Sequence, residues 1–427
     1  MLEINITTAV LTFIIALFIQ AHVTRRHLSG ILDPLTYFIV TSSFAVTLAA
    51  TLVNDAYIFS RVAIYLFFFW LGFFITSPSS KNRDTTKTEH RIRKDASFSI
   101  IITTGVLLVI TANIFAWQRA GVPLFSIDPS LQKSESLKDG LGIVRRLNWG
   151  LGTFLFMGSV FWILFNQSKI AVTYLTSLAL VAILNGSKSA LLPIVFAIGL
   201  FLKNPFLNNK LNSIKEHTRS LSRYTLIIAA VPVLAVFLIE SDDITEAAIA
   251  LGTRLLYFGD ALLYWSDSEL RQHFKSIHPP HSYPMHLFGG ILGATRLVPY
   301  SAPIGNDFVQ FSLRVGQELS DSLGPNVPFY VKGEIFFGTV FAAAYSTIIG
   351  MAIAFFRRIF SQREYSNLTS YTIAATLAGL SMTLPVEDSL MINRIFDFAL
   401  FLTPTIIFSR ILIWSTRRLT PNSNDYS

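Results

Sequence analysis

The chain contains no cysteine among its 427 residues. This absence excludes disulfide frameworks, zinc-thiolate sites and thiol nucleophiles. Charged residues are also scarce, at 14%, where an ordinary soluble domain has about 25%. No glycine-rich phosphate loop of the nucleotide-binding type occurs. With few charges and 52% hydrophobic residues, the chain is expected to lie in a lipid bilayer.

Apolar segments follow one another along the chain at lengths suited to a bilayer. About 20 apolar residues cross the hydrocarbon core as a helix, which satisfies its own backbone polar groups. We therefore expect an all-α polytopic membrane protein with about 11 transmembrane helices. The segments are 4–20, 34–53, 56–76, 97–116, 147–165, 169–185, 188–203, 224–240, 335–356, 369–385 and 393–413. Asp33-Pro34 predicts a helix start, since it combines an N-cap residue with proline at the first helical position.

Lys and Arg are concentrated on alternate loops between these segments. The basic loops contain Arg25, Arg26, Lys81, Arg83, Lys87, Arg91, Arg93, Lys94, Lys169, Lys203, Lys210, Lys215, Arg219, Arg223, Arg357, Arg358, Arg363, Arg417 and Arg418. Cytoplasmic loops retain basic residues, so the N-terminus is predicted outside and the C-terminus inside. The net charge of +8 thus reports topology and does not indicate nucleic-acid binding.

This topology divides the chain into three parts. Residues 1–240 hold helices one to eight with an outer loop at 117–146. Residues 241–334 form a large outer loop, too long for a simple connection, in which we expect short amphipathic helices. Residues 335–427 hold the last three helices and a cytoplasmic tail. Apolar residues at three- and four-residue spacing predict one amphipathic helix over 307–323, while Pro279, Pro280 and Pro284 are expected to break helices.

Polar residues near the outer membrane edge are the first candidates for a site. Lys188 lies at the tip between two short segments, where an ionisable group below the interface indicates function; the alternative is a lysine that reaches the headgroups. Glu334 stands before segment nine, where a carboxylate either reacts or interacts with the helix dipole. Arg394 opens the last segment, with Asp397 three residues on, a spacing often seen in structural ion pairs.

Outer arginines form a pool of candidate anion ligands, because guanidinium presents a planar fork of donors. With Lys188 and Arg394, the pool for pyrophosphate or sugar comprises Arg145, Arg146, Arg254, Arg296 and Arg314. Four histidines fall within fourteen residues, but their spacing matches no standard zinc pattern. We therefore predict no metal and no other cofactor. Besides Glu334, the candidate bases are Asp260 and His281.

One stretch resembles a known family. Gly324-Pro325 followed by Gly333-Glu334, aromatics and Gly338 is similar to the end of the large outer loop in O-antigen and oligosaccharide repeat-unit polymerases of the Wzy type. Shared features elsewhere are Gly121-Val122-Pro123-Leu124 after a helix, Gly186-Ser187-Lys188-Ser189 at a helix tip, and a many-helix plan with one large outer loop late in the chain.

The resemblance implies a bacterial inner-membrane glycosyltransferase with a GT-C-like fold. Its substrates would be undecaprenyl-pyrophosphate-linked glycans, which it would join into O-antigen or a related surface polysaccharide at the periplasmic face without a metal. A flippase and a chain-length regulator of the same pathway are the expected protein partners. The alternatives are an O-antigen ligase, another glycosyltransferase that uses a lipid-linked sugar, and a polysaccharide or lipid transporter.

The loop charges generate a topology prediction. Reporter fusions after residue 90 and residue 215 should read as cytoplasmic, and a fusion near residue 280 as periplasmic, because basic loops stay on the cytoplasmic side. Paired enzymatic reporters that are active on opposite sides of the membrane measure this. A cytoplasmic signal at residue 280 would contradict the assignment.

Overall fold

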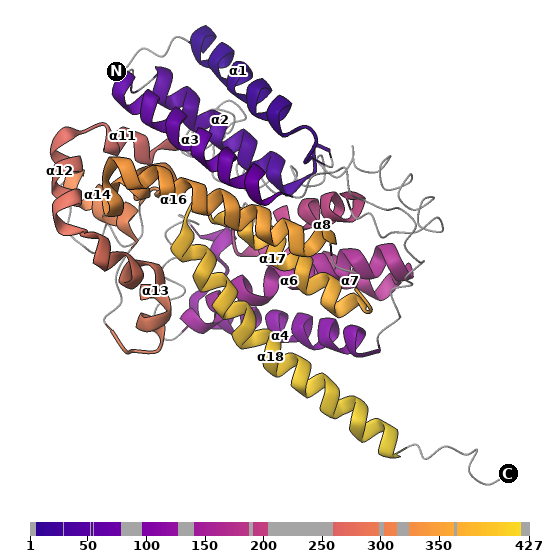
Figure 1. Ribbon diagram of the computed structural model, residues 1–427. Coiled ribbons are helices and arrows are strands. Elements are labelled where there is room, and N and C mark those ends of the chain that lie inside the picture. The colour runs from indigo at the N-terminus through magenta and orange to yellow at the C-terminus, as the bar shows by residue number, and fades with distance from the viewer. Residues whose placement is uncertain are drawn as a thin grey trace.

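The computed structural model describes residues 6–28, 30–51, 53, 55–77, 96–126, 141–187, 191–203, 259–298, 303–313, 324–362 and 365–419. Within these ranges the architecture is helical (Figure 1). Seven of the described helices are long and apolar enough to cross a membrane. The predicted class, a helical membrane protein, is confirmed at this level.

The seven long helices correspond to seven of the predicted segments. They are α1 (Ile6–Thr24), α2 (Pro34–Thr51), α3 (Ala56–Thr76), α4 (Ala96–Ala120), α6 (Gly142–Asn166), α16 (Phe329–Gln362) and α18 (Asp388–Leu419). Three other predicted segments form shorter helices, α7 (Lys169–Leu184), α8 (Leu192–Lys203) and α17 (Leu368–Leu380). Segment 224–240 lies outside the described residues, so the predicted number of eleven is not reached within them.

Short helices cover one end of the bundle, on the left in Figure 1. They are α11 (Ala261–Trp265), α12 (Ser268–Ile277), α13 (Tyr283–Ala294) and α14 (Ile304–Leu313), with a 3-10 turn at Pro280–Ser282. We call this the capped end. It agrees with the expected short helices of the large loop, although the described part of the 307–323 helix stops at Leu313. Pro284 lies in the first turn of α13, so it begins a helix and the prediction that it breaks one was wrong.

A buried ion pair lies at the end of the bundle opposite the capped end. The Arg357 guanidinium donates to Asp33 at 2.5 Å and thereby joins the C-terminal part of α16 to the start of α2. Asp33 also accepts a hydrogen bond of 2.9 Å from the Leu35 amide, which confirms the helix start predicted at Asp33-Pro34. Arg25 and Arg26 lie exposed at the same end, just after α1.

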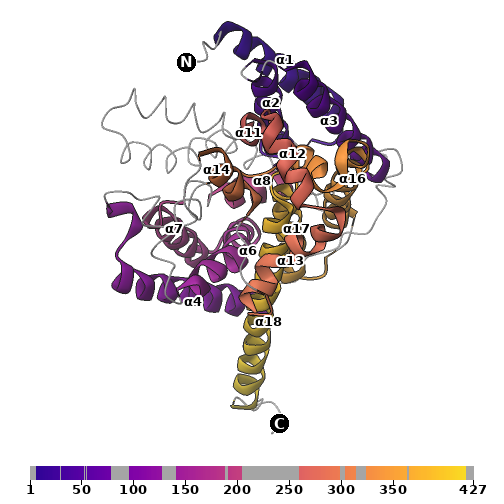
Figure 2. The same ribbon diagram turned by 90° about the vertical axis from the view of Figure 1, so that its left-hand side faces the viewer.

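Three late helices connect the two halves of the bundle. In Figure 2, α16 lies beside α3, while α17 and the start of α18 lie toward α6; the C-terminal half of α18 extends beyond the other helices. In this arrangement α16 packs along α3, and α18 packs along α6. Small residues permit the closest of these contacts, since a Cβ at Gly72 would overlap the Thr347 carbonyl and one at Gly350 the Phe69 carbonyl. Backbones approach closely only where side chains are this small.

This contact predicts that Gly350→Ala destabilises the protein by roughly 1–3 kcal/mol, because the added methyl group overlaps rigid backbone of α3. Gly152→Ala in α6 is the matched control, since a Cβ there meets no atom within 4 Å. Thermal unfolding in detergent compares the two variants with the wild type. Equal unfolding temperatures for both would show that α3 and α16 do not depend on this close approach.

Candidate functional site

Three arginines from the sequence-predicted pool converge at the capped end. Arg145 and Arg146 lie in the first turns of α6, and Arg394 lies in the second turn of α18. Trp149 follows Arg145 by one helical turn, so both side chains share a face of α6. The guanidinium carbons of Arg145 and Arg394 lie 5.2 and 5.8 Å from the centre of the Trp149 ring. The sequence did not show this convergence, because it joins residues some 250 positions apart.

Arg146 fixes the same region by hydrogen bonds. It donates to the Asp397 carboxylate at 2.8 Å and to the Gly290 carbonyl at 2.7 Å, so one guanidinium joins α6, α18 and α13. Asp397 therefore pairs with Arg146 across helices; the sequence spacing had instead suggested a pair with Arg394 on one helix face. Gly150 makes the approach possible, since a Cβ there would lie 2.6 Å from the Asp397 carbonyl oxygen.

We call Arg145, Arg146, Trp149, Arg394 and Asp397 the arginine–tryptophan site. Its charge is unbalanced, because three guanidinium groups have one carboxylate in ion-pair contact among the described residues. The buried Nε atoms of Arg145 and Arg394 have no hydrogen-bond partner there. Trp149 remains 36% exposed between them. Two guanidinium groups with unpaired Nε donors beside a partly exposed ring are chemically compatible with a phosphate group attached to a sugar.

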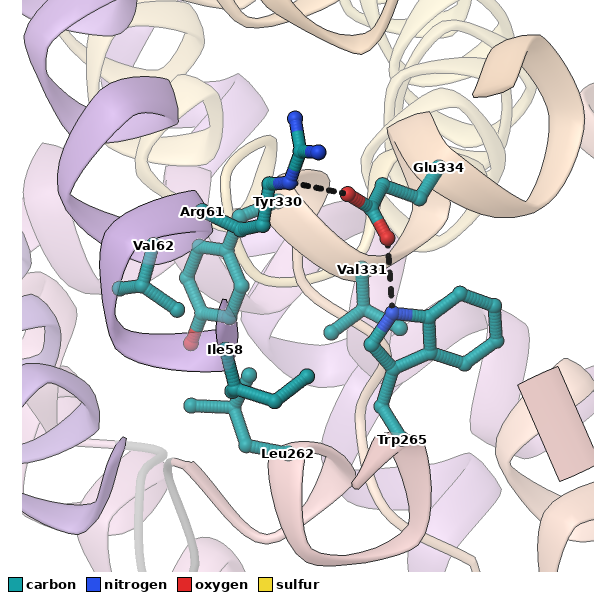
Figure 3. Close-up of a pocket in the computed structure, with 8 residues that line it drawn as sticks. All are labelled: Ile58, Arg61, Val62, Leu262, Trp265, Tyr330, Val331 and Glu334. Atoms are coloured by element: carbon teal, nitrogen blue, oxygen red, sulfur yellow. Dashed lines mark hydrogen bonds and ion pairs between the residues drawn. The ribbon is translucent and has the colours of Figure 1, made fainter. Parts of the chain in front are cut away.

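Glu334 occupies a second cluster, the Glu334 site, made with Tyr65, Trp265, Arg61 and Lys275. The Tyr65 hydroxyl donates to one carboxylate oxygen at 2.5 Å. The Trp265 indole donates to the other oxygen at 3.1 Å, as Figure 3 shows. Arg61 and Lys275 lie 3.8 Å from the two oxygens. The carboxylate is buried, and the adjoining cavity measures about 10 Å³, room for about one water molecule.

The backbone explains why Glu334 is buried. α16 begins at Phe329, six residues before the predicted start, so Glu334 lies inside the helix and not at its mouth. Gly338 interrupts the helical path with φ 68° and ψ 178°, a region open to glycine. The short segment before this kink turns Glu334 toward α3 and α11. As arranged here, the carboxylate holds two cations in place; its predicted role as a base stays a prediction.

A third cluster was not found from the sequence. The Lys332 ammonium is buried and donates to both Glu387 and Asp388, the latter at 2.6 Å. Asp388 also accepts hydrogen bonds from the hydroxyls of Tyr345 and Tyr283, at 2.5 and 2.6 Å. We call these five residues the buried lysine cluster. Adjacent acids between the last two apolar segments, with a lysine two residues before Glu334, were the available signal.

His286, whose imidazole can coordinate a metal ion, lies beside this cluster. Single ligand atoms of His286, Glu387 and Asp388 lie within 4.8 Å of one another, a spacing compatible with a metal ion. The Lys332 ammonium, however, contacts both carboxylates and supplies the positive charge that a metal would bring. Burial lowers the pKa of His286 to about 3, so its imidazole is neutral.

The remaining candidates are dispersed. Asp260 precedes α11, its Oδ1 atom is buried without a hydrogen-bond partner among the described residues, and burial raises its pKa to about 7. His281 is exposed in the 3-10 turn before α13, and Arg296 is exposed after α13 with a φ of 58°. Neither is joined to the arginine–tryptophan site. Lys188, Arg254 and Arg314 lie outside the described residues.

Comparisons with known proteins leave the site to be interpreted from its own chemistry. No protein family, curated protein or solved structure matches the chain.

Asp260 generates a pH prediction. Its native pKa of about 7 lies above the value of about 4 expected in an unfolded chain. Between these values the native state binds more protons than the unfolded state, so stability should fall as the pH rises from about 4 to 7. Asp260→Asn should remove this part of the slope. Unfolding temperatures in detergent between pH 5 and 8 measure it, and parallel curves for both proteins would contradict the raised pKa.

Proposed function

We propose that the chain is a membrane glycosyltransferase that polymerises oligosaccharide units carried on a polyprenyl pyrophosphate, of which undecaprenyl pyrophosphate is the expected form. The observation that carries the proposal is the arginine–tryptophan site. The guanidinium groups of Arg145 and Arg394 flank an exposed indole ring, and the neighbouring Arg146 is paired with the Asp397 carboxylate. A sugar on the ring and a pyrophosphate against the arginines match the two halves of such a substrate.

The site suits the chemistry of this transfer. A hydroxyl of the acceptor sugar attacks the anomeric carbon of the donor glycan, and the bond from that carbon to the pyrophosphate oxygen breaks. The hydroxyl proton passes to a base, and the lipid pyrophosphate leaves with an additional negative charge. Arg145 and Arg394, whose Nε donors have no hydrogen-bond partner among the described residues, would stabilise that charge. Fixed donors directed at a developing charge often supply the largest catalytic contribution.

Of the three candidate bases, Asp260 has the protonation behaviour that a base requires, although it lies before α11, apart from the arginine–tryptophan site. A carboxyl group with a pKa of about 7 exchanges its proton readily at neutral pH. Both oxygens of Glu334 instead accept hydrogen bonds, and Glu334 has little space beside it. His281 is the other candidate base, because its side chain is exposed and open to substrate.

We further propose that the capped end faces the periplasm of a bacterial inner membrane. The support is the loop charge, since Arg25 and Arg26 follow α1, and Arg357 and Arg358 lie in the last turns of α16, where Arg357 contacts Asp33 and His27. This orientation puts the N-terminus in the periplasm and the C-terminus in the cytoplasm. Lipid-linked units would then arrive at the site after transport across the membrane, consistent with a flippase and a chain-length regulator as partners.

Arg145→Gln and Arg394→Gln should each reduce polymer formation by roughly 100-fold or more, since each removes a charged donor from the leaving group. Arg296→Gln is the matched control, because Arg296 is exposed near the same end and lies outside the cluster. Polysaccharide length on gels, at equal amounts of membrane protein, measures the effect.

A strain without the ligase that removes glycan from its carrier separates polymerisation from ligation. Loss of long chains still attached to the carrier lipid supports the proposal. Wild-type chain lengths in both arginine variants would remove the arginine–tryptophan site from the reaction and contradict the proposed function.

A further inference from the structure

A second pair of guanidinium groups flanks an aromatic ring at the start of α3. The guanidinium carbon of Arg61 lies 4.8 Å from the centre of the Tyr57 ring, and that of Arg271 lies 5.5 Å from it. Arg61 comes from the second turn of α3, and Arg271 from α12 of the cap. The pair therefore joins a long apolar helix to the short helices that cover the capped end.

The charge of this region is also unbalanced. Lys275 lies one turn after Arg271 on α12, so three cations gather here. Among the described residues, Glu334 is the one carboxylate in ion-pair contact with them, at 3.8 Å from both Arg61 and Lys275. Tyr65 and Trp265 also hydrogen-bond to Glu334 and hold it in place. A fixed internal carboxylate thus aligns the cations and leaves an excess of positive charge.

The donors of these cations are partly open. In Figure 3 the two terminal nitrogens of Arg61 point away from Glu334, which faces the Nε atom. Arg271 uses one terminal nitrogen to donate to the carbonyls of Trp265 and Ser266. The side chains of Arg61 and Lys275 are 28% and 34% exposed, so a ligand can reach them.

The surroundings of the cations indicate the class of ligand. Tyr57 is in the first turn of a helix long and apolar enough to cross a membrane, the position at which aromatic side chains meet headgroups. Further along α3, Ile64 and Phe67 are exposed, at three-residue steps from Arg61. An anion bound at the cations would therefore have an apolar helix face beside it for a hydrocarbon chain.

We infer that Arg61, Arg271 and Lys275 form a site for the phosphate group of a membrane lipid. Two guanidinium groups and an ammonium supply the donors for phosphate oxygens, and the exposed face of α3 receives the chain. The site shares no residue with the arginine–tryptophan site, so it does not depend on the proposed function. A bilayer phospholipid and a polyprenyl pyrophosphate both carry the required group.

Native mass spectrometry of the detergent-solubilised protein tests this site with phosphatidylglycerol as the anionic probe and phosphatidylcholine as the zwitterionic reference. The wild type should retain phosphatidylglycerol at least tenfold more tightly than Arg61→Gln/Lys275→Gln, with phosphatidylcholine unaffected. Arg61→Lys should restore part of the difference, since it keeps the charge and loses the fork. Arg119→Gln is the control, because Arg119 also stacks on a ring, that of Phe115, without a second guanidinium among the described residues.

Glu334 is buried, so removing both cations risks misfolding. Adding Glu334→Gln to the double variant removes the unpaired charge and keeps the shape of the cluster. Farnesyl pyrophosphate identifies the source: displacement of phosphatidylglycerol at equal concentration supports a pyrophosphate lipid, and retention supports a bilayer phospholipid. Equal phosphatidylglycerol binding by the wild type and by folded double or triple variants would overturn the inference, whatever the polymer assays show.

Discussion

The pairing of one buried lysine with two carboxylates sets the geometry of the capped end. Lys332 donates to both Glu387 and Asp388 at the start of α18. Tyr283 of α13 donates to Asp388 as well. Arg394 and Asp397 follow within three turns on α18, so their placement depends on this anchor. Removal of one partner of a buried ion pair typically costs about 3–5 kcal/mol. Arg394 and Asp397 of the arginine–tryptophan site therefore lie on a helix whose start is anchored by this buried ion-pair cluster.

A single short helical segment organises the whole region. Lys332 and Glu334 are two residues apart, so they project from nearly opposite sides of the segment before the kink at Gly338. The side that carries Lys332 contacts α18 and α13, and the side that carries Glu334 contacts α3 and α11. Because the two clusters share this segment, a shift of the segment moves both of them. The positive φ of Gly338 separates this segment from the membrane helix and gives it an independent direction.

Local sequence patterns identified the helices but not the contacts between them. Apolar length predicted the long helices, and Asp33-Pro34 marked a helix start, because both depend on neighbouring residues. Arg145, Arg146 and Arg394 entered the pool by their chemistry and their place near helix ends. Their convergence, and the pairing of Arg146 with Asp397, arise from packing between distant helices. Lys332 escaped notice because the predicted helix began at residue 335, which left the lysine in the outer loop, and because its partners follow it by more than fifty residues.

The hydrogen bond between Arg146 and Asp397 joins residues 251 positions apart in the chain. The two residues are therefore synthesised at different times. During synthesis α6 leaves the ribosome long before α18. Until α18 follows, Arg146 lacks its partner carboxylate, Asp397. The arginine–tryptophan site is completed only when the last helix inserts. A chain truncated before α18 would therefore leave Arg146 without its carboxylate partner and the face of α6 at Gly150 without the backbone that packs on it.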